Sequence, residues 1–492
     1  MAVYEMSALV LGRAIHERRI SAPEALTELL RRLHQTEDAI HAYLTLDVEG
    51  AMHRAKLVQE RIDRGETKSS LAGVPIALKD NICVNGMKTT CASRMLADFI
   101  PPYSATAVEK LLENDMVLYG KLNMDEFAMG STTETSYFGI TVNPWGKDRV
   151  PGGSSGGAAA AVAIGSAFCA LGSDTGGSIR QPASHCGVTG FKPTYGTVSR
   201  YGLIAYASSL EQIGPIGRDA ADCAALMDII RGVDARDSTS CPSTSKPYAA
   251  CLENNVRGLR IAVPVECLEG AISPDVARCV ERMARELEKM GAVVSKINFP
   301  LMKYAVSAYY TIATAEAASN LSRYDGIKYG YRPDGDMPLS EVYTRSRSEG
   351  FGSEVKRRII LGNFVLSAGY YDAYYRRALQ AKAAIKAYLE DVFRDYDLLL
   401  MPTAPTTAPR IGTSLDDVAG MYSTDCYTVS ANLAGLPALT LPCGFGTDGL
   451  SLPIGAQLIG AAFTDARVLS AGFAYQQMTD YHTKRPWEVS VP

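Results

Sequence analysis

Two glycine-rich loops that carry serines place the strongest constraint on how this chain can fold. The first, Pro151 to Gly157, has the sequence Pro-Gly-Gly-Ser-Ser-Gly-Gly, and the second runs from Gly172 to Ala183. An apolar helix-like segment and an apolar strand-like segment separate them. Because glycine has no Cβ, such loops expose successive N–H groups that can point at an anion. One helix and one strand between two loops can bring both loops to the same edge of a sheet, so we expect their serines to meet there.

Two other structures also use loops of this kind, and the surrounding sequence argues against both. A flexible Gly/Ser linker is an alternative for one such loop, but apolar segments adjoin both of these loops. A phosphate-binding loop requires the pattern G-x-x-x-x-G-K-[ST], which the chain does not contain. The favoured interpretation is a site in which the backbone amides of Thr175 to Ser178 form an oxyanion hole around an attacking serine.

Short apolar runs alternate with helix-like segments around the loops, which is typical of an α/β protein. The strand-like runs cover residues 74–78, 117–119 and 167–171, and the helix-like segments cover residues 105–113, 157–165 and 220–230. Residues 259–263 and 293–297 predict two more strands, with a helix between them that begins at Pro274. This βαβ unit predicts that the sheet draws strands from both halves of the chain. Residues 304–331 and 369–396 are tyrosine-rich and predict helices whose rings mostly pack onto the core.

The first 66 residues predict a helical segment that covers the rest of the molecule. Ser21 and Glu24 match a capping box, and apolar residues then recur at helical spacing. Residues 237–248 are rich in Ser, Thr and Pro and resemble a linker, but similar strands and helices resume directly after them. We therefore predict a helical cover at residues 1–66 and a single α/β domain at residues 67–492, without a domain boundary at 237–248.

Composition excludes several function classes. The 492 residues include 49 Lys and Arg against 53 Asp and Glu, with a net charge of -4, so the surface is not one that grips nucleic acid or anionic lipid. Eleven cysteines without a CxxC pair predict neither a disulfide framework nor a zinc site, and we expect no bound metal and a reducing, cytoplasmic location. The first residues lack the pattern of a secretory signal. Residues 150–173 contain no charged residue beyond Arg149 and before Asp174, but their Gly, Ser and Ala content predicts a core helix rather than a membrane span.

Histidine is too scarce for a Ser-His-Asp triad, so the candidate base is a lysine. Four of the six histidines lie in the N-terminal helical segment. Lys79 ends the apolar run 72–78, which puts its amine at the mouth of a buried strand. Lowering the pKa of a lysine from about 10.4 to near 7 takes about 4 kcal/mol, which burial can supply. A lysine at a strand end is more often a solvated cap, and only the neighbouring serine loops favour the catalytic interpretation.

Three separate segments resemble the amidase signature family, in the same order along the chain. They are residues 71–81, the Gly-Gly-Ser-Ser-Gly-Gly loop, and the loop Asp-Thr-Gly-Gly-Ser-Ile-Arg with residues 187–196 after it. The resemblance implies an α/β fold with a large mixed central sheet that helices cover on both faces. It also implies that Lys79 is the general base, Ser154 the bridging serine, preceded by a cis peptide bond, and Ser178 the nucleophile.

This resemblance implies a complete mechanism for amide hydrolysis. Lys79, as a neutral amine, takes a proton through the Ser154 hydroxyl from Ser178, which attacks the amide carbonyl. The oxyanion is held by the backbone amides of four residues: Thr175, Gly176, Gly177 and Ser178. We predict that Asp174 and Arg180, which flank the nucleophile, brace the loop; the alternative is that each is solvated.

Further segments resemble one branch of the family, the glutamine-hydrolysing A subunits of the tRNA-dependent amidotransferases, from about residue 70 to the end. They are residues 123–130, 195–203, 208–215, 354–359, 370–375 and 432–437. The resemblance implies a heterotrimer with B and C subunits, in which ammonia released from glutamine passes to the B subunit. That subunit uses ATP and Mg²⁺ and holds most of the misacylated tRNA, so no cofactor is expected in this chain. It leaves open whether Glu-tRNA(Gln), Asp-tRNA(Asn) or both are amidated.

The same resemblance identifies a pocket for glutamine, a zwitterion that requires both a cation and an anion. It assigns the α-carboxylate to Arg358, the α-amine to Asp425 and a nearby hydroxyl to Tyr309. Residues 425–428 and 400–402 differ slightly from the usual family pattern. Two alternatives stay open: a stand-alone amidase that acts on small amides, and a catalytically silent scaffold within a tRNA complex.

Overall fold

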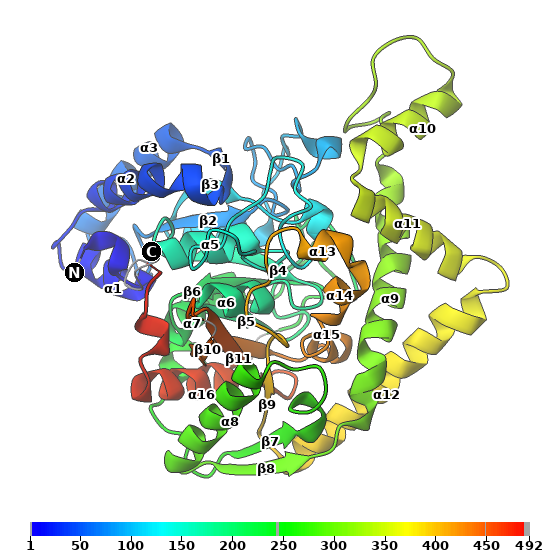
Figure 1. The fold of residues 1–492 in the computed structure, drawn as a ribbon. Helices are drawn as coiled ribbons and strands as arrows, with labels where there is room; N and C mark the ends of the chain where they lie inside the picture. The colour runs from blue at the N-terminus through cyan, green and yellow to red at the C-terminus, as the bar shows by residue number, and fades with distance from the viewer. Residues whose placement is uncertain (1, 243–245, 448, 487–492) are drawn as a thin grey trace.

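A mixed sheet of eleven strands forms the centre of the molecule in the computed structural model, which describes residues 2–242, 246–447 and 449–486 (Figure 1). Across the sheet the strands follow the order β1-β3-β2-β4-β6-β5-β10-β11-β9-β7-β8. The strands are β1 (Tyr43–Leu46), β2 (Pro75–Lys79), β3 (Val117–Leu122), β4 (Ala170–Asp174), β5 (Thr189–Lys192), β6 (Gln212–Gly217), β7 (Arg260–Pro264), β8 (Val293–Ile297), β9 (Leu398–Pro402), β10 (Ala438–Phe445) and β11 (Pro453–Gly460). The sheet therefore draws on both halves of the chain, as predicted.

Helices connect most of these strands. The α-helices are α1 (Ala8–His16), α2 (Ala22–Ile40), α3 (Val48–Asp63), α4 (Thr106–Glu113), α5 (Gly156–Ile164), α6 (Arg180–Cys186), α7 (Ala220–Ile230), α8 (Pro274–Lys289), α9 (Ala305–Asn320), α10 (Leu339–Gly350), α11 (Ser353–Leu366), α12 (Arg376–Asp395), α13 (Thr413–Asp416), α14 (Val418–Ser423), α15 (Val429–Ala434) and α16 (Asp465–Met478). A short π-helical turn, η8 (Tyr371–Tyr375), precedes α12. The predicted βαβ unit is present, since β7 and β8 pair in parallel with α8 between them.

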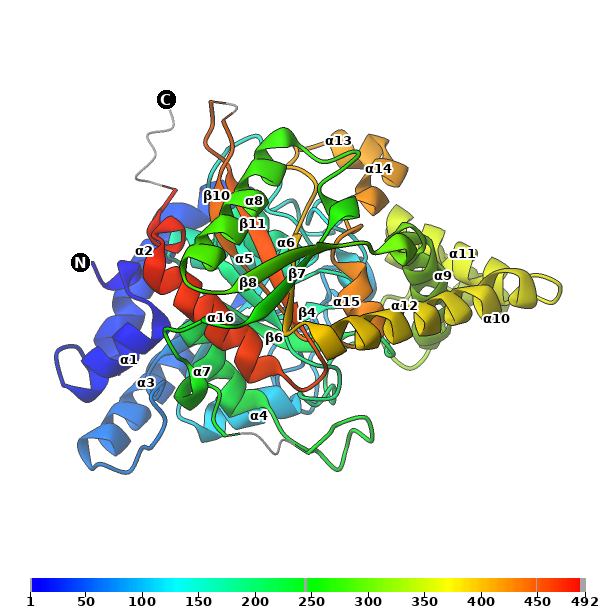
Figure 2. The same cartoon turned by 90° about the horizontal axis from the view of Figure 1, so that it is seen from below.

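In strands β7, β9, β10 and β11 the two faces of the sheet belong to two hydrophobic clusters, because successive side chains of a strand point in opposite directions. In β9, Leu398 and Leu400 pack into one cluster, whereas Leu399 and Met401 pack into the other. The first cluster includes buried residues of α5, α7, α8 and α16, and the second includes those of α9, α12 and α15. Figure 2 shows α8 and α16 lying across the strands on one side. This arrangement confirms the predicted α/β fold with helices on both faces.

Three neighbouring strands, β3, β2 and β4, run in parallel, so their carboxyl ends meet at one edge. Lys79 is the last residue of β2 and Asp174 is the last residue of β4. Helix α5, which is buried along almost its whole length, begins beside this edge, directly after the first glycine-rich loop. In parallel α/β sheets, ligands bind outside the carboxyl ends of the strands. The topology therefore places both serine loops and the candidate lysine together.

The N-terminal segment is helical for the most part, with one exception that the sequence analysis missed. The predicted capping box at Ser21 and Glu24 is present at the start of α2. Residues 43–46, however, form β1, which pairs antiparallel with β3 at one edge of the sheet. Helix α1 is also tied to the main body, because the backbone amides of Ala8 and Leu9 donate to Asp222 of α7. The division of the chain at residue 66 stays a prediction.

Most predicted elements are present with shifted ends. The strand expected at 167–171 lies at 170–174, so it continues to the second serine loop. The helix expected over 304–331 ends at Asn320 and is followed by irregular chain. Of the predicted linker at 237–248, residues 243–245 lie outside the described residues. The predicted core helix in 150–173 is α5, and no described helix is long and apolar enough to cross a membrane.

Helices α10 and α11 and the turn before α12 extend away from the sheet, at the right of Figure 1. Eight large apolar side chains between residues 360 and 379 are 37–68% exposed there. They are Ile360, Leu361, Phe364, Leu366, Tyr370, Tyr371, Tyr374 and Leu379. We call this set the hairpin patch.

Candidate active site

Lys79 is fully buried, and its amine lies between the two serine loops. Its Nζ donates to the Ser154 Oγ at 2.6 Å and to the backbone oxygen of Ser173 at 3.2 Å. Burial lowers the pKa of Lys79 to about 7, and the nearby carboxylates of Asp125 and Asp174 oppose that shift. A substantial fraction of the amine is therefore neutral near pH 7 and able to accept a proton.

Ser154 follows a cis peptide bond from Gly153, as the family resemblance implies. It is also completely buried. The backbone oxygen of Ser154 accepts from the Asp125 amide at 3.2 Å, and the Thr133 hydroxyl donates to the oxygen of Gly152 at 2.8 Å. These contacts tie the loop to the segment after β3 and hold the hydroxyl of Ser154 at the amine of Lys79.

Ser178 lies in the second loop, and the structure places this loop directly against the first. The Ser155 amide donates to the Ser178 backbone oxygen at 3.0 Å. Ser178 is 8% exposed, whereas Ser154 and Lys79 are 0% exposed. Of the three predicted catalytic residues, Ser178 is therefore the one that reaches solvent, as a group that attacks an external substrate must.

The four amides predicted to form the oxyanion hole are not equivalent. The Gly177 amide donates to Asp174 Oδ1 at 2.8 Å, so it is already engaged. The amides of Thr175, Gly176 and Ser178 have no protein acceptor within residues 2–242, 246–447 and 449–486. An oxyanion would therefore find three amides available, while the fourth keeps the turn in shape.

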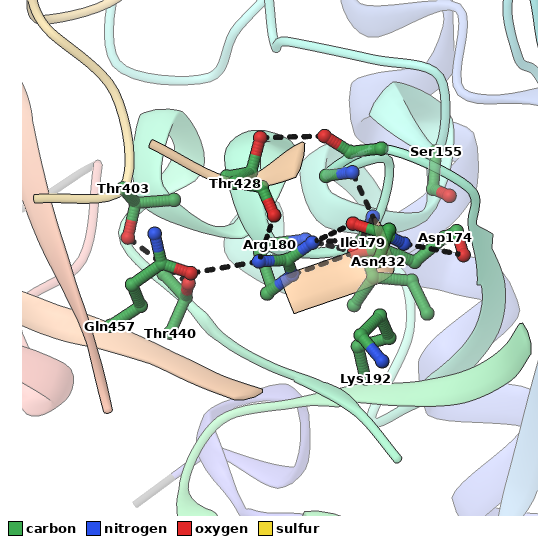
Figure 3. Close-up of polar contacts among 12 residues, drawn as sticks. Ser155, Asp174, Ile179, Arg180, Lys192, Thr403, Thr428, Asn432, Thr440 and Gln457 are labelled. Atoms are coloured by element: carbon green, nitrogen blue, oxygen red, sulfur yellow. Dashed lines mark hydrogen bonds and ion pairs between the residues drawn. The ribbon is translucent and has the colours of Figure 1, made fainter. Parts of the chain in front are cut away.

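Asp174 and Arg180 are both fully buried, and together they bond the nucleophile loop to distant parts of the chain (Figure 3). Asp174 accepts from the Arg180 Nε at 3.0 Å and from the Asn432 side chain at 2.9 Å. Arg180 also donates to the backbone oxygen of Thr428 at 3.0 Å and to Gln457 at 2.8 Å. Burial is the largest single influence and would raise the pKa of Asp174, but the charge and hydrogen bonds of Arg180, with Lys192 and Asn432, together hold that pKa below its usual range. The predicted bracing role is confirmed.

Arg358 is 2% exposed and surrounded by aromatic rings. Its Nε donates to Glu354 at 2.7 Å and one terminal nitrogen donates to the Tyr206 hydroxyl at 2.8 Å. Its guanidinium carbon lies 5.2–5.6 Å from the ring centroids of Tyr206, Tyr310 and Tyr422. The other terminal nitrogen, Nη2, has no acceptor among the described residues. A buried, unpaired donor of this kind favours an anionic ligand, because leaving its hydrogen bond unmade is costly.

Asp425 shares a neighbour with Arg358, because Tyr310 contacts both residues. The Tyr310 hydroxyl donates to its carboxylate at 2.7 Å, and the Ser131 hydroxyl lies 3.2 Å from both carboxylate oxygens. Burial raises the pKa of Asp425 to about 6, with Tyr310 and Arg358 opposing that shift. The group is therefore mostly ionised near pH 7 and can bind a cation.

Tyr309 connects this pocket to the nucleophile loop. A Cβ added to Gly176 would lie 2.5 Å from the Tyr309 hydroxyl oxygen, so glycine is required there for the ring to approach. The Tyr309 and Tyr310 rings meet edge to face, with centroids 5.0 Å apart. The predicted pocket residues thus lie close to the loop that holds Ser178.

Several side chains of the site were missed from the sequence. Glu354, four residues before Arg358 on the same helix, could have been found from the i,i+4 spacing of an ion pair. Tyr310 and Tyr206 had no such signal, because most rings in tyrosine-rich helices pack into cores. Ser131 lies in a polar run that gives no hint of its partner, 294 residues away.

The described residues contain no group of three or more His, Cys, Asp or Glu side chains that could hold a metal ion. The buried lysine and the two serine loops support the chemistry of a lysine-activated serine. The available amides at residues 175, 176 and 178 can stabilise an oxyanion, and a cation and an anion lie near the same loop. The arrangement fits acyl transfer from a substrate that carries both charges.

Comparison with known proteins agrees with the family resemblance found in the sequence. A family model described as Amidase matches residues 24–469, and so it includes most of the N-terminal segment that the sequence analysis left outside the resemblance. A protein of Agathobacter rectalis, named as the A subunit of glutamyl-tRNA(Gln) amidotransferase, is 52% identical over 97% of this chain and 94% of that protein. The protein of the same name from Moorella thermoacetica is 52% identical over 99% of each chain.

A solved structure extends the similarity to three dimensions. The crystal structure of the protein of the same name from Thermotoga maritima superimposes with a TM-score of 0.79. It is 40% identical in sequence and covers 98% of this chain and 97% of its own. With the lysine and both serine loops at one sheet edge, and the family model matching nearly the whole length, this chain belongs to the amidase signature family.

Proposed function

We propose that this chain is the glutaminase subunit of a tRNA-dependent amidotransferase. It hydrolyses glutamine to glutamate and ammonia, and the ammonia passes to a partner subunit that amidates misacylated Glu-tRNA(Gln), Asp-tRNA(Asn) or both. The names of the similar proteins support the glutamyl-tRNA(Gln) assignment. The substrate pocket supports glutamine.

The reaction begins with the neutral amine of Lys79. It draws a proton from the Ser154 hydroxyl, 2.6 Å away, as Ser154 takes one from Ser178. The Ser178 oxygen attacks the side-chain amide carbon of glutamine, and the amides of Thr175, Gly176 and Ser178 hold the oxyanion. The proton returns through the same pair to the leaving nitrogen, which departs as ammonia. Water then attacks the acyl-serine by the reverse route and releases glutamate.

The observation that carries the proposal is that Arg358 and Asp425 both contact Tyr310. Both charges are buried, and the Nη2 of Arg358 lacks a partner among the described residues. An amino acid with a free α-carboxylate supplies the missing partner of Arg358, and its α-ammonium is a counter-charge for Asp425, whose present donors, Tyr310 and Ser131, are neutral. A small neutral amide supplies neither, so the pocket favours glutamine over substrates of a stand-alone amidase.

The first experiment measures ammonia release from glutamine by this chain alone, and then with its partner subunits, ATP, Mg²⁺ and misacylated tRNA. We expect release to rise sharply in the complete mixture. Acetamide and propionamide serve as control substrates that lack both α-groups. Equal turnover of glutamine and these amides by the isolated chain would support the stand-alone amidase instead.

The second experiment tests the catalytic assignment with Ser178→Ala. The variant should lose glutamine-dependent amidation by about 10⁴-fold, while amidation from added ammonium chloride continues. Ser166→Ala is the control, because Ser166 is also buried but follows the carboxyl end of α5, away from the serine loops. Glutaminase activity retained by Ser178→Ala would show that another residue is the nucleophile. If glutamine-dependent amidation by the complex were the same with the variant as with the unchanged chain, this chain would be a catalytically silent scaffold.

The proposal includes B and C partner subunits in a cytoplasmic heterotrimer. ATP and Mg²⁺ belong to the B subunit, which also holds most of the tRNA. The net charge of -4 supports a chain that does not grip the tRNA itself. The hairpin patch supports assembly, since contiguous exposed apolar side chains mark interaction surfaces. Replacing Phe364 with Glu should reduce co-purification with the partners, whereas Phe138→Glu, at an exposed ring outside the patch, should not.

A further inference from the structure

Two cysteines that are far apart in sequence lie against each other beneath the surface. Cys279 is on α8 and Cys443 is on β10, and the two thiols influence each other's pKa; the Cys443 Sγ also donates to the Ile454 backbone oxygen at 3.5 Å. A Cβ added to Gly444 would lie 2.6 Å from the Cys279 Sγ, so the sulfur rests directly on the backbone that follows Cys443. The two cysteines are 4% and 0% exposed. They are therefore held as a pair by the packing of a helix on the sheet.

Arg282 completes the cluster from the next turn of α8. Its Nη2 lies 3.4 Å from the Cys279 Sγ and 2.7 Å from the Cys443 backbone oxygen. The side chain is 40% exposed, so it covers the thiols on the solvent side. The Cys443 thiol and then the charge of Arg282 lower the pKa of Cys279 to about 7, against the effect of burial. Cys279 is thus ionised far more readily than an ordinary buried thiol.

Other charged groups around the pair modify this effect without removing it. Asp275, one turn earlier on α8, disfavours the thiolate, and Arg278 favours it. Glu286 forms an ion pair with Arg282 at 3.9 Å, and the guanidinium carbon of Arg282 lies 5.0 Å from the centroid of the Tyr481 ring. The guanidinium therefore stays next to the sulfur.

We propose that Cys279 and Cys443 form a peroxide-reactive dithiol that closes an intramolecular disulfide between α8 and β10. The Cys279 thiolate attacks one oxygen of hydrogen peroxide, the O–O bond breaks, and the leaving hydroxide takes a proton to become water. The Cys443 thiol then attacks the sulfenic sulfur of Cys279. A second water leaves with the thiol proton, and the S–S bond forms. Two thiols are oxidised and one peroxide is reduced to two waters, independently of the reaction proposed above.

Each member of the cluster has a defined part in this reaction. Cys279 is the attacking thiol, because it is the one that touches Arg282. Cys443 resolves the sulfenic acid, and the Cys279 thiol and burial keep its pKa well above the ordinary value. Cys169 and Cys223 provide an internal control, since they are a neighbouring buried pair whose pKa values burial raises strongly. They should remain reduced under the same treatment.

The test treats the intact, full-length protein with hydrogen peroxide near pH 7.5, blocks free thiols and maps the non-reduced peptides by mass spectrometry. We expect a linked pair of peptides with a mass two hydrogens below their sum. The tryptic peptide that holds Cys443 also holds Cys426, so fragmentation must assign the linked sulfur. A link through Cys426, or no link at all, would overturn the proposal.

Variants then separate the roles. Cys443→Ser should accumulate a sulfenic acid at Cys279 that dimedone traps, whereas Cys279→Ser should leave Cys443 unmodified. Arg282→Gln should slow disulfide formation about tenfold, because the thiolate fraction falls. Arg285→Gln, an exposed arginine on the same helix, should leave the rate unchanged. Equal rates in both arginine variants, or faster labelling of Cys443 than Cys279, would contradict the assigned roles.

Discussion

The nucleophile loop and the pocket beside it are both buried and charged, but they differ in how completely their charges are paired. Asp174 and Arg180 bond to each other, to backbone amides and to Asn432 and Gln457. In the pocket, the Nη2 of Arg358 is unpaired among the described residues. The charged side chains of the loop are therefore fully paired within the protein, whereas the charged side chains of the pocket need a ligand to complete their pairing.

From this difference we infer which buried charges stabilise the fold and which bind substrate. A buried ion is costly unless its hydrogen bonds are made. Where the protein makes them all, as around Arg180, removing one partner should destabilise the fold. Where one is left open, as at Arg358, the open position should appear in substrate affinity. Four predictions test that contrast.

The largest effect should follow Arg180→Met. The change leaves Asp174 buried without its cation, and such a loss typically costs about 3–5 kcal/mol in the free energy of unfolding. Denaturation in urea, followed by circular dichroism, measures it. Arg394→Met is the control, because Arg394 is 80% exposed and its removal should cost little. A loss below about 1 kcal/mol for Arg180→Met would mean that the loop does not depend on this pair.

Arg358→Lys should instead act on the substrate. Lysine keeps the charge beside Glu354 but cannot reproduce the second terminal nitrogen, so the KM for glutamine should rise about 10- to 100-fold, as expected for a lost charge-assisted hydrogen bond. Steady-state kinetics gives the KM, and thermal unfolding checks the fold. Arg357→Lys, a neighbour that is 43% exposed, should leave the KM unchanged. If Arg358→Lys lowered stability but left the affinity for glutamine unchanged, Arg358 would be a structural residue like Arg180 and not a substrate-binding one.

The pH dependence tests whether Lys79 is the base. Its pKa lies at about 7 and only the neutral amine accepts a proton, so kcat/KM should level off above pH 7 and fall about tenfold between pH 7 and 6. Below pH 6 the fall should steepen, because Asp425, whose pKa is about 6, loses its charge there as well. Burial also lowers the pKa of Lys192 to about 7. Rates measured from pH 5.5 to 9 should show the same fall in kcat/KM below pH 7 in the Lys192→Met variant. If that fall disappeared in the variant, the titrating group would be Lys192 and not Lys79.

The smallest effect should come from Tyr310→Phe. It removes one hydrogen bond of 2.7 Å from Asp425 and keeps the ring against Arg358. A hydrogen bond to a charged group is worth about 1.5–3 kcal/mol, but Ser131 still donates to Asp425 and offsets part of the loss, so the KM for glutamine should rise about five- to tenfold with little change in kcat. Isothermal calorimetry with the Ser178→Ala variant gives the same change in affinity without turnover. Tyr370→Phe, at an exposed ring, is the matched control.

The sequence predicted the parts of the site that local pattern encodes. The alternation of short apolar runs with helix-like segments predicted the fold class, and Lys79 at the end of an apolar run together with the two glycine-rich loops predicted where the site lies. The family resemblance supplied Arg358, Asp425 and Tyr309. Strand β1 was missed because four residues, Tyr43–Leu46, between two long helices give too short a period-two signal to recognise.

The partners of the site residues were harder to predict, because they depend on contacts between distant segments. Ser131 and Tyr310 contact Asp425 although they are 294 and 115 residues away from it in the sequence, and no spacing pattern along the chain predicts such a contact. The engaged amide of Gly177 is a different case. It follows from the turn that brings Asp174 back onto its own loop, a conformation that a glycine-rich sequence permits but does not specify.

The bonds of Arg180 also bear on when this protein becomes an enzyme during its synthesis. The nucleophile loop is translated early, yet Arg180 is held by Thr428, Asn432 and Gln457, which lie 248, 252 and 277 residues further along the chain. A nascent or truncated chain that stops before residue 428 contains every catalytic side chain but none of these three partners, and one that stops before β11 still lacks Gln457. We therefore expect a fragment that ends early to have the sequence of the site without its activity.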